Sequence, residues 1–176
     1  MIDMAQHKHR EKYTMAQNKI NLLIVDDEEQ FLKSISRSLE MRDFDVVTAN
    51  RGDKALEIAR QHPVDIALVD LKMPGMDGQE TLEALKKQHP WMEIVILTGH
   101  GTIDSAAACS RAGAFSYLQK PCEFDQLLDT LTQAFRKRVM NKKQIEDKKM
   151  DAMMRISMGH SPREILARLR EIDQAD

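Results

Sequence analysis

Three acids, a hydroxyl and a lysine each lie just past, or at the end of, a short apolar run that is typical of a buried strand. These residues are Asp26, Asp27, Asp70, Thr98 and Lys120. In an α/β sheet, a carboxylate at the carboxyl end of a strand lies in the crevice where such folds place their ligands. The fold alone does not require polar groups at every one of these positions, so the set predicts a functional site.

Carboxylates that converge at one edge of a sheet repel one another. At a separation of 4 Å, each pair costs about 4 kcal/mol at an effective dielectric constant of 20. A divalent cation removes this repulsion and neutralises the charge of a transferring phosphoryl group. Hard oxygen ligands completed by water suit Mg²⁺ better than Zn²⁺. The acids therefore predict a magnesium site for phosphoryl transfer.

The same residues also have ordinary structural interpretations. Asp26 and Asp27 could be an N-cap pair for the helix that follows, and Lys120 could be a solvated surface lysine. Thr98 could be a simple β-branched strand residue, and Tyr117 a packing aromatic. We interpret Asp77 as a helix N-cap, preceded by a turn that uses the neighbouring glycines, Gly75 and Gly78.

Apolar runs and segments of helical periodicity alternate five times along the chain. The predicted strands are 21–25, 44–49, 64–69, 93–98 and 114–119, and the predicted helices are 28–41, 52–61, 78–88, 102–112 and 123–138. Strands separated by helices require a parallel sheet with helices on both faces, connected by right-handed crossovers. The predicted fold class is therefore α/β, with a domain at 20–138.

Composition, charge and hydropathy argue against nucleic-acid binding, membrane insertion and secretion. The 176 residues are 42% hydrophobic with a net charge of −2, so we do not expect nucleic-acid binding. No apolar run approaches the roughly 20 residues that span a bilayer, and 1–19 has no apolar segment of a secretory signal. We expect a cytoplasmic protein without membrane contact, in which Cys109 and Cys122 are free thiols.

The two ends of the chain differ from the domain between them. Residues 1–19 form a polar leader, which we expect to be disordered or a frayed helix. Residues 139–176 form a predicted helical extension, too short for a winged-helix or ATPase domain. The basic segment 136–143 is interpreted as a solvated helix face. A capping box with proline at the first helical position predicts a second short helix from about residue 161.

The ordered motifs of this chain resemble the receiver domain of two-component response regulators. The matching residues are Asp26-Asp27, Asp70 with the turn 73–78, Thr98-Gly99, Tyr117 and Lys120-Pro121. The intervals also fit, with 43 residues from Asp27 to Asp70, 28 more to Thr98 and 22 more to Lys120. The stretch from 97 to 121 is most similar to receivers of sigma-54-type activators.

The resemblance implies a flavodoxin-like (βα)5 fold with strand order 2-1-3-4-5. It also implies roles for individual residues. Asp70 is the phospho-acceptor and nucleophile. Mg²⁺ is bound by Asp27, Asp70 and the backbone carbonyl of Lys72, with Asp26 acting mainly through water. Lys120 and Thr98 contact the phosphoryl oxygens, Thr98 and Tyr117 form the switch, and Pro121 follows a cis peptide bond.

The implied function is a signalling phospho-acceptor that receives a phosphoryl group from a histidine kinase or phosphotransfer protein. It is not a metabolic enzyme, and we expect only self-phosphorylation and slow autodephosphorylation. Lys72 and His100 lie where side chains face the attacking water. Phosphorylation would switch protein interactions, including self-association through the face of the fourth helix, fifth strand and fifth helix, or through the extension. The kinase, the target and the oligomeric state are left open.

Two other interpretations are weighed against this one. The first keeps the fold as a constitutive interaction module without phosphorylation, although degenerate receivers usually lose one of the acids. The second is a flavodoxin-like cofactor binder or an aspartate-nucleophile phosphatase. Such phosphatases require a second acid where Lys72 stands, and the acids at 26–29 would repel the phosphate of a flavin.

Overall fold

The computed structural model describes residues 19–157, in which strands and helices alternate from the first strand onward. The elements are β1 (Ile20–Val25), α2 (Glu29–Glu40), β2 (Phe44–Ala49), α3 (Gly52–Gln61), β3 (Ile66–Val69), α4 (Gly78–Gln88), β4 (Glu93–Thr98), α5 (Ile103–Arg111), β5 (Ser116–Gln119) and α6 (Phe124–Ser157). The predicted leader, apart from Lys19, and the predicted helix near residue 161 lie outside the described residues.

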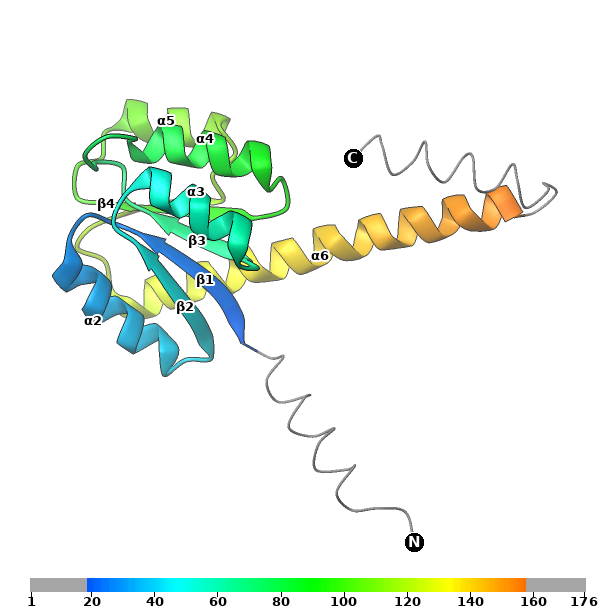
Figure 1. Ribbon diagram of the computed structural model, residues 1–176, viewed down its shortest axis with the longest axis horizontal. Coiled ribbons are helices and arrows are strands. Elements are labelled where there is room, and N and C mark those ends of the chain that lie inside the picture. The colour runs from blue at the N-terminus through cyan, green and yellow to red at the C-terminus, as the bar shows by residue number, and fades with distance from the viewer. Residues whose placement is uncertain (1–18, 158–176) are drawn as a thin grey trace, which may run out of the picture. The chain divides into compact units, whose positions relative to one another are not determined.

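The five strands form one parallel sheet in the order β2-β1-β3-β4-β5. This confirms the fold class and the strand order implied by the resemblance. Figure 1 shows β1 between β2 and β3. The order reverses between β1 and β3, so a crevice opens beyond the carboxyl ends of these two strands. The site is therefore expected at that edge.

Side chains on the two faces of the sheet form two separate cores. One core contains Leu23 and Val25 of β1 with residues of α3, α4 and α5. The other contains Leu22 and Ile24 of β1 with residues of α2 and the first part of α6. Every residue of β3 and β4 is buried, because helices cover both faces of a parallel sheet. Burial on both sides fixes the register that aligns the strand ends.

The last helix differs from its predicted bounds, because α6 continues from Phe124 to Ser157 instead of ending at residue 138. No glycine or proline interrupts this stretch, and lysine, glutamine, methionine and alanine are strong helix formers. The predicted strands at 64–69 and 114–119 are each two residues too long at their beginning. Asp65 and Phe115 already donate backbone hydrogen bonds to neighbouring strands, so pairing begins irregularly there.

The chain divides into two units, Met1–Arg138 and Val139–Asp176. In the first unit, the interpretation of 136–143 as a solvated face is wrong for Arg138, which is partly buried and pairs with Asp65 at 2.9 Å, while Lys137 is exposed and pairs with Glu93 at 3.3 Å. In the second unit, Met140 and Met150 are exposed. Within residues 19–157, no helix is both long and apolar enough to cross a membrane.

Candidate acidic site at the carboxyl edge of the sheet

The pairing of β1 with β3 places two of the predicted acids side by side. Val25 is in register with Val69, and Asp70 donates its backbone N–H to the carbonyl of Val25 at 2.9 Å. Asp26, Asp27 and Asp70 each offer a carboxylate oxygen, and these oxygens lie within 4.8 Å of one another. Asp26 and Asp70 are buried, whereas Asp27 is exposed. The three acids therefore form one cluster with an open side at Asp27.

Lys120 reaches this cluster from the end of β5. Its Nζ lies 2.5 Å from Oδ2 of Asp26 and 3.3 Å from Oε1 of Glu28. The same ammonium lies 4.0 Å from the ring centroid of Phe31, a cation–π distance. Asp26 also accepts the backbone N–H of Glu28 at 2.9 Å. Lys120 is thus held at the site and is not a solvated surface lysine.

The interpretation of Asp26 and Asp27 as an N-cap pair is also wrong. Helix α2 has Glu28 at its N-cap, and no side chain caps it. The peptide bond between Lys120 and Pro121 is cis, as the resemblance implied.

The charges at the site do not balance, because several carboxylates share one lysine. Burial raises the pKa of Asp26, and the charge of Asp70 adds to this effect against the opposing contacts of Lys120. Burial disfavours the charge of Lys120, but its contacts with Asp26, Asp70 and Glu28 outweigh burial and raise the pKa of Lys120. Both shifts have the directions expected for an excess of negative charge.

One oxygen of the cluster has no hydrogen-bond partner within residues 19–157. Oδ1 of Asp70 is buried and accepts no hydrogen bond from any described residue. A buried acceptor without a partner is costly, and such atoms in folded proteins usually indicate a further group at the site. Three hard carboxylate ligands, one of them exposed, fit an octahedral Mg²⁺ that keeps several waters. The residues present therefore fit the magnesium ion that the sequence predicts.

The turn that follows β3 packs closely against the backbone of Asp70. Gly75 adopts a φ of +82°, and the side chain of Asp77 caps α4 in a capping box with Glu80. A Cβ at Gly78 would lie 2.1 Å from the backbone oxygen of Asp70, so only glycine fits there. The N-cap and turn predicted for Asp77, Gly75 and Gly78 are confirmed. Lys72 lies exposed in this turn, where its side chain is free to face the cluster or solvent.

The two predicted switch residues lie on neighbouring strands. Thr98 is fully buried, and its hydroxyl accepts the backbone N–H of His100 at 3.2 Å. Tyr117 is partly buried, and its hydroxyl lies 3.2 Å from Oγ of Ser105 in α5. Gly101 leaves the space that this ring occupies, because a Cβ there would lie 1.9 Å from the tyrosine oxygen. The structure therefore connects Tyr117 to α5 rather than to Thr98.

Sequence reasoning missed three residues of the site, namely Glu28, Phe31 and Ser105. Phe31 packs partly buried beside the core, so in the sequence it has the pattern of an ordinary apolar helix residue. Glu28 follows the acid pair directly, so the clustering of charge alone could have identified it. Nothing in the sequence indicates that Ser105 meets Tyr117, because the contact depends on how α5 packs.

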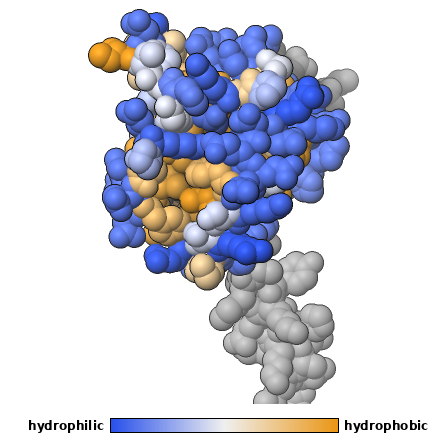
Figure 2. Space-filling view, turned by 90° about the vertical axis from the view of Figure 1, so that its left-hand side faces the viewer, coloured by the Kyte–Doolittle hydropathy of each residue, from blue (hydrophilic) through white to orange (hydrophobic). Residues whose placement is uncertain are grey.

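An apolar groove opens beside Lys120, between α2 and the connection from β5 to α6. Phe31, Ile35 and Phe124 are among its lining residues, together with Gly99 and Pro121. Figure 2 shows an apolar hollow ringed by hydrophilic side chains, on the side of the molecule that faces left in Figure 1. A partner that covers this groove would lie next to the acid cluster.

Comparison with known proteins decides the family. Residues 22–132 match the response regulator receiver domain. The chain belongs to this family. Transcriptional regulatory protein GlrR of Escherichia coli K12 is 36% identical over 120 residues, which cover 68% of this chain and 27% of GlrR. Alginate biosynthesis transcriptional regulatory protein AlgB of Pseudomonas putida KT2440 is 33% identical over 142 residues, which cover 81% of this chain and 30% of AlgB.

Solved structures agree with this assignment. The CheY-like receiver domain protein of Methanospirillum hungatei JF-1 is 28% identical, with a TM-score of 0.68, and the match covers 70% of this chain and 98% of that one. The curated regulators are much longer, so this chain spans less than a third of the length of GlrR or AlgB.

Proposed function

We propose that this receiver accepts a phosphoryl group on Asp70 from a histidine kinase or a phosphotransfer protein. The observation that carries the proposal is the buried, unpartnered Oδ1 of Asp70 inside a cluster of three carboxylates. A carboxylate that is desolvated and has no hydrogen-bond donor is available as a nucleophile. Lys120, in contact with Asp26, is close enough to move its charge toward an arriving phosphoryl group.

The chemistry is a single displacement at phosphorus. An oxygen of Asp70 forms a bond to the phosphorus atom while the bond to the donor imidazole nitrogen breaks, and the electron pair stays on that nitrogen. Lys120 and the hydroxyl of Thr98 would contact the phosphoryl oxygens and stabilise their charge. Asp27, Asp70 and the backbone carbonyl of Lys72, with Asp26 through water, would hold a Mg²⁺ ion, which would supply further neutralisation of these oxygens.

Phosphorylation would be transmitted through Thr98 and Tyr117. When Thr98 contacts the phosphoryl group, space is released next to β5, and Tyr117 can leave Ser105 and turn inward. The affected face is formed by α5, β5 and the first part of α6, where the exposed Ile103 also lies. We propose that this face, or the extension after Arg138, changes its association with a partner or with a second copy.

Mass spectrometry tests the site of phosphorylation. Incubation with Mg²⁺ and acetyl phosphate should add one phosphoryl group of about 80 Da to the parent protein, as expected for an aspartyl nucleophile. Asp70→Asn should abolish this addition. Asp45→Asn, which changes an exposed acid on β2, should leave it intact. Stoichiometric labelling of the Asp70→Asn protein would disprove the assignment, and failure to label the parent protein would favour a constitutive interaction module.

A further inference from the structure

Strand β2 is at the edge of the sheet, and no other strand of residues 19–157 pairs with its outer side. The backbone N–H of Ile20 donates to the carbonyl of Asp43, and that of Asp26 donates to the carbonyl of Ala49. The backbone N–H and C=O groups of the odd-numbered residues of β2 therefore point toward β1. Because backbone direction alternates along a strand, the N–H and C=O groups of Val46 and Thr48 point away from the sheet. These groups form a template for a further strand.

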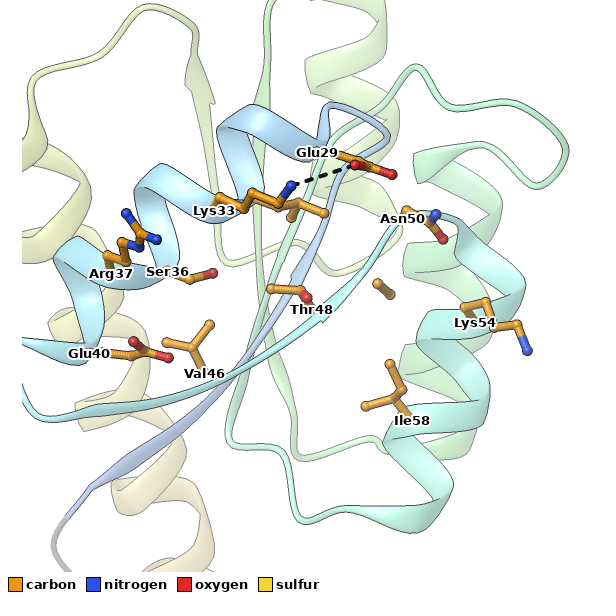
Figure 3. A pocket seen from close by; sticks show the side chains of 12 residues that line it. Glu29, Lys33, Ser36, Arg37, Glu40, Val46, Thr48, Asn50, Lys54 and Ile58 are labelled. Carbon is orange, nitrogen blue, oxygen red and sulfur yellow. Dashed lines mark ion pairs between the residues drawn. The ribbon is translucent and has the colours of Figure 1, made fainter.

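The outer edge of β2 lies at the bottom of a groove. The groove has a volume of about 610 Å³ and is lined by residues of α2 on one side, α3 on the other and β2 between them. Figure 3 shows Ser36 and Arg37 on α2, Lys54 and Ile58 on α3, and Thr48 between the two helices. Leu32, Val46 and Ile58 give the groove apolar surface. The helices flank the edge closely, which favours a single extended segment over a second sheet with its own helices.

The polar groups of the groove are only partly satisfied. Oγ of Ser36 is buried and has no hydrogen-bond partner among the described residues. Lys33 pairs with Glu29 at 3.8 Å, and Lys54 pairs with Glu57 at 2.7 Å. In the described part of the chain, the guanidinium of Arg37 takes part in none of the ion pairs. Glu40, which also lines the groove, is likewise in none of these pairs, so a segment with an acidic group beside Arg37 and none beside Glu40 would meet complementary charges.

We propose that this groove binds an extended peptide segment of a partner protein, which adds to β2 as a sixth strand. The backbone of the segment hydrogen-bonds to Val46 and Thr48, as in other cases of strand addition. An acidic side chain of the segment pairs with Arg37, and small aliphatic side chains cover the apolar surface. This site is separate from the acid cluster, so the proposal does not depend on phosphorylation of Asp70.

Amide hydrogen exchange of the full chain tests the proposal with a panel of synthetic peptides. Each peptide has about eight residues, enough to span β2, with valine and threonine alternating and one glutamate at a different position in each. Binding should slow exchange at Val46 and Thr48 by about tenfold. Exchange at Asp45 and Val47 should stay unchanged, because their amides already bond to β1. A peptide with prolines at alternate positions should have no effect.

Two charge-reversal variants distinguish peptide binding in the groove from general electrostatic attraction to the protein. Arg37→Glu should weaken binding of the best peptide about fivefold, the usual size of an exposed ion pair. Arg111→Glu is the matched control, because Arg111 is also an exposed arginine in the last turn of a helix. The proposal is overturned if no peptide slows exchange at Val46 and Thr48. It is also overturned if both reversals weaken binding equally.

Discussion

Acidic side chains are buried at both ends of the sheet, but the number of lysines that neutralise their charge differs between the two ends. At the amino end, the buried Glu93 pairs with Lys86 at 3.7 Å and with Lys137 at 3.3 Å. At the carboxyl end, the cluster of Asp26, Asp27 and Asp70 has Lys120 as its nearby cation, and Lys120 is also shared with Glu28. Acids at the amino end therefore hold helices in place, while acids at the carboxyl end keep an excess of negative charge, as the proposed function requires.

Asp65 strengthens this contrast at the amino end. It accepts hydrogen bonds from the backbone and the side chain of Asn21, at 3.0 and 2.9 Å, and pairs with Arg138 at 2.9 Å. Its partners therefore come from both β1 and α6. No comparable set of partners surrounds Asp70, whose Oδ1 lacks any partner within residues 19–157. An acid whose oxygens all have partners, such as the partly buried Asp65, is structural, and a buried acid with missing partners indicates function.

The largest loss of stability is expected when the ion pairs of Glu93 at the amino end of the sheet are broken. Glu93→Gln keeps the shape of the side chain but leaves Lys86 and Lys137 without their shared carboxylate. We expect a loss of about 2–4 kcal/mol in the free energy of unfolding, since removing one partner of a buried ion pair leaves a charge uncompensated. Urea unfolding followed by circular dichroism measures this loss.

A surface pair provides the control for this change. Glu57→Gln breaks the exposed pair with Lys54 and should leave the unfolding midpoint unchanged. If Glu93→Gln is equally harmless, the amino-end acids do not stabilise the fold, and the contrast between the two ends fails.

The sequence predicted the carboxyl end better than the amino end, for a physical reason. Asp26, Asp70 and Lys120 are recognisable because each lies at or just past the end of an apolar strand, and parallel strands end at the same edge. Glu93 begins a strand, and its partner Lys137 is 44 residues away, so the pair depends on how α6 packs. The end of α6 was also mispredicted, because the apolar face that docks on the sheet ends before residue 138 while the helix continues to Ser157.

The second prediction concerns the excess of negative charge at the carboxyl end. Asp70→Asn should raise the free energy of unfolding of the metal-free protein by about 1–2 kcal/mol, because it removes one of the repelling charges. Mg²⁺ should then stabilise the parent protein more than the variant. Thermal unfolding with and without Mg²⁺ measures both effects. Equal Mg²⁺ shifts in the parent and the variant would show that the cation binds elsewhere.

The raised pKa of Asp26 makes the stability gain of Asp70→Asn depend on pH. An acid whose pKa is higher in the folded state destabilises the fold above that pKa, and the cost disappears as the pH falls and the acid takes up a proton. Asp70 contributes to the raised pKa of Asp26, so Asp70→Asn brings that pKa closer to its ordinary value. The advantage of the variant should therefore shrink as the pH falls from 7 toward 4. A constant advantage over this range would exclude repulsion by Asp26 as its cause.

The smallest effect is expected at the contact between the carboxyl end and α5. Tyr117→Phe removes the hydrogen bond to Ser105 and should cost about 0.5–1 kcal/mol in unfolding free energy. Its larger consequence concerns the proposed switch, since the bond holds Tyr117 beside Ser105. The phosphoryl mimic beryllofluoride should shift the self-association of the parent protein, and Tyr117→Phe should shift the resting state partly toward the activated one.

Sedimentation velocity distinguishes the surfaces that could respond. Ser110→Ala, which removes an exposed hydroxyl from the same helix, should behave as the parent protein does in both states.

If the response to beryllofluoride survives deletion of 139–176, it arises on the face of α5, β5 and the first part of α6. If deletion abolishes the response, the extension carries it. If beryllofluoride alters self-association in neither form and Tyr117→Phe changes nothing, Tyr117 is a packing residue, because a switch must favour one state through differential contacts.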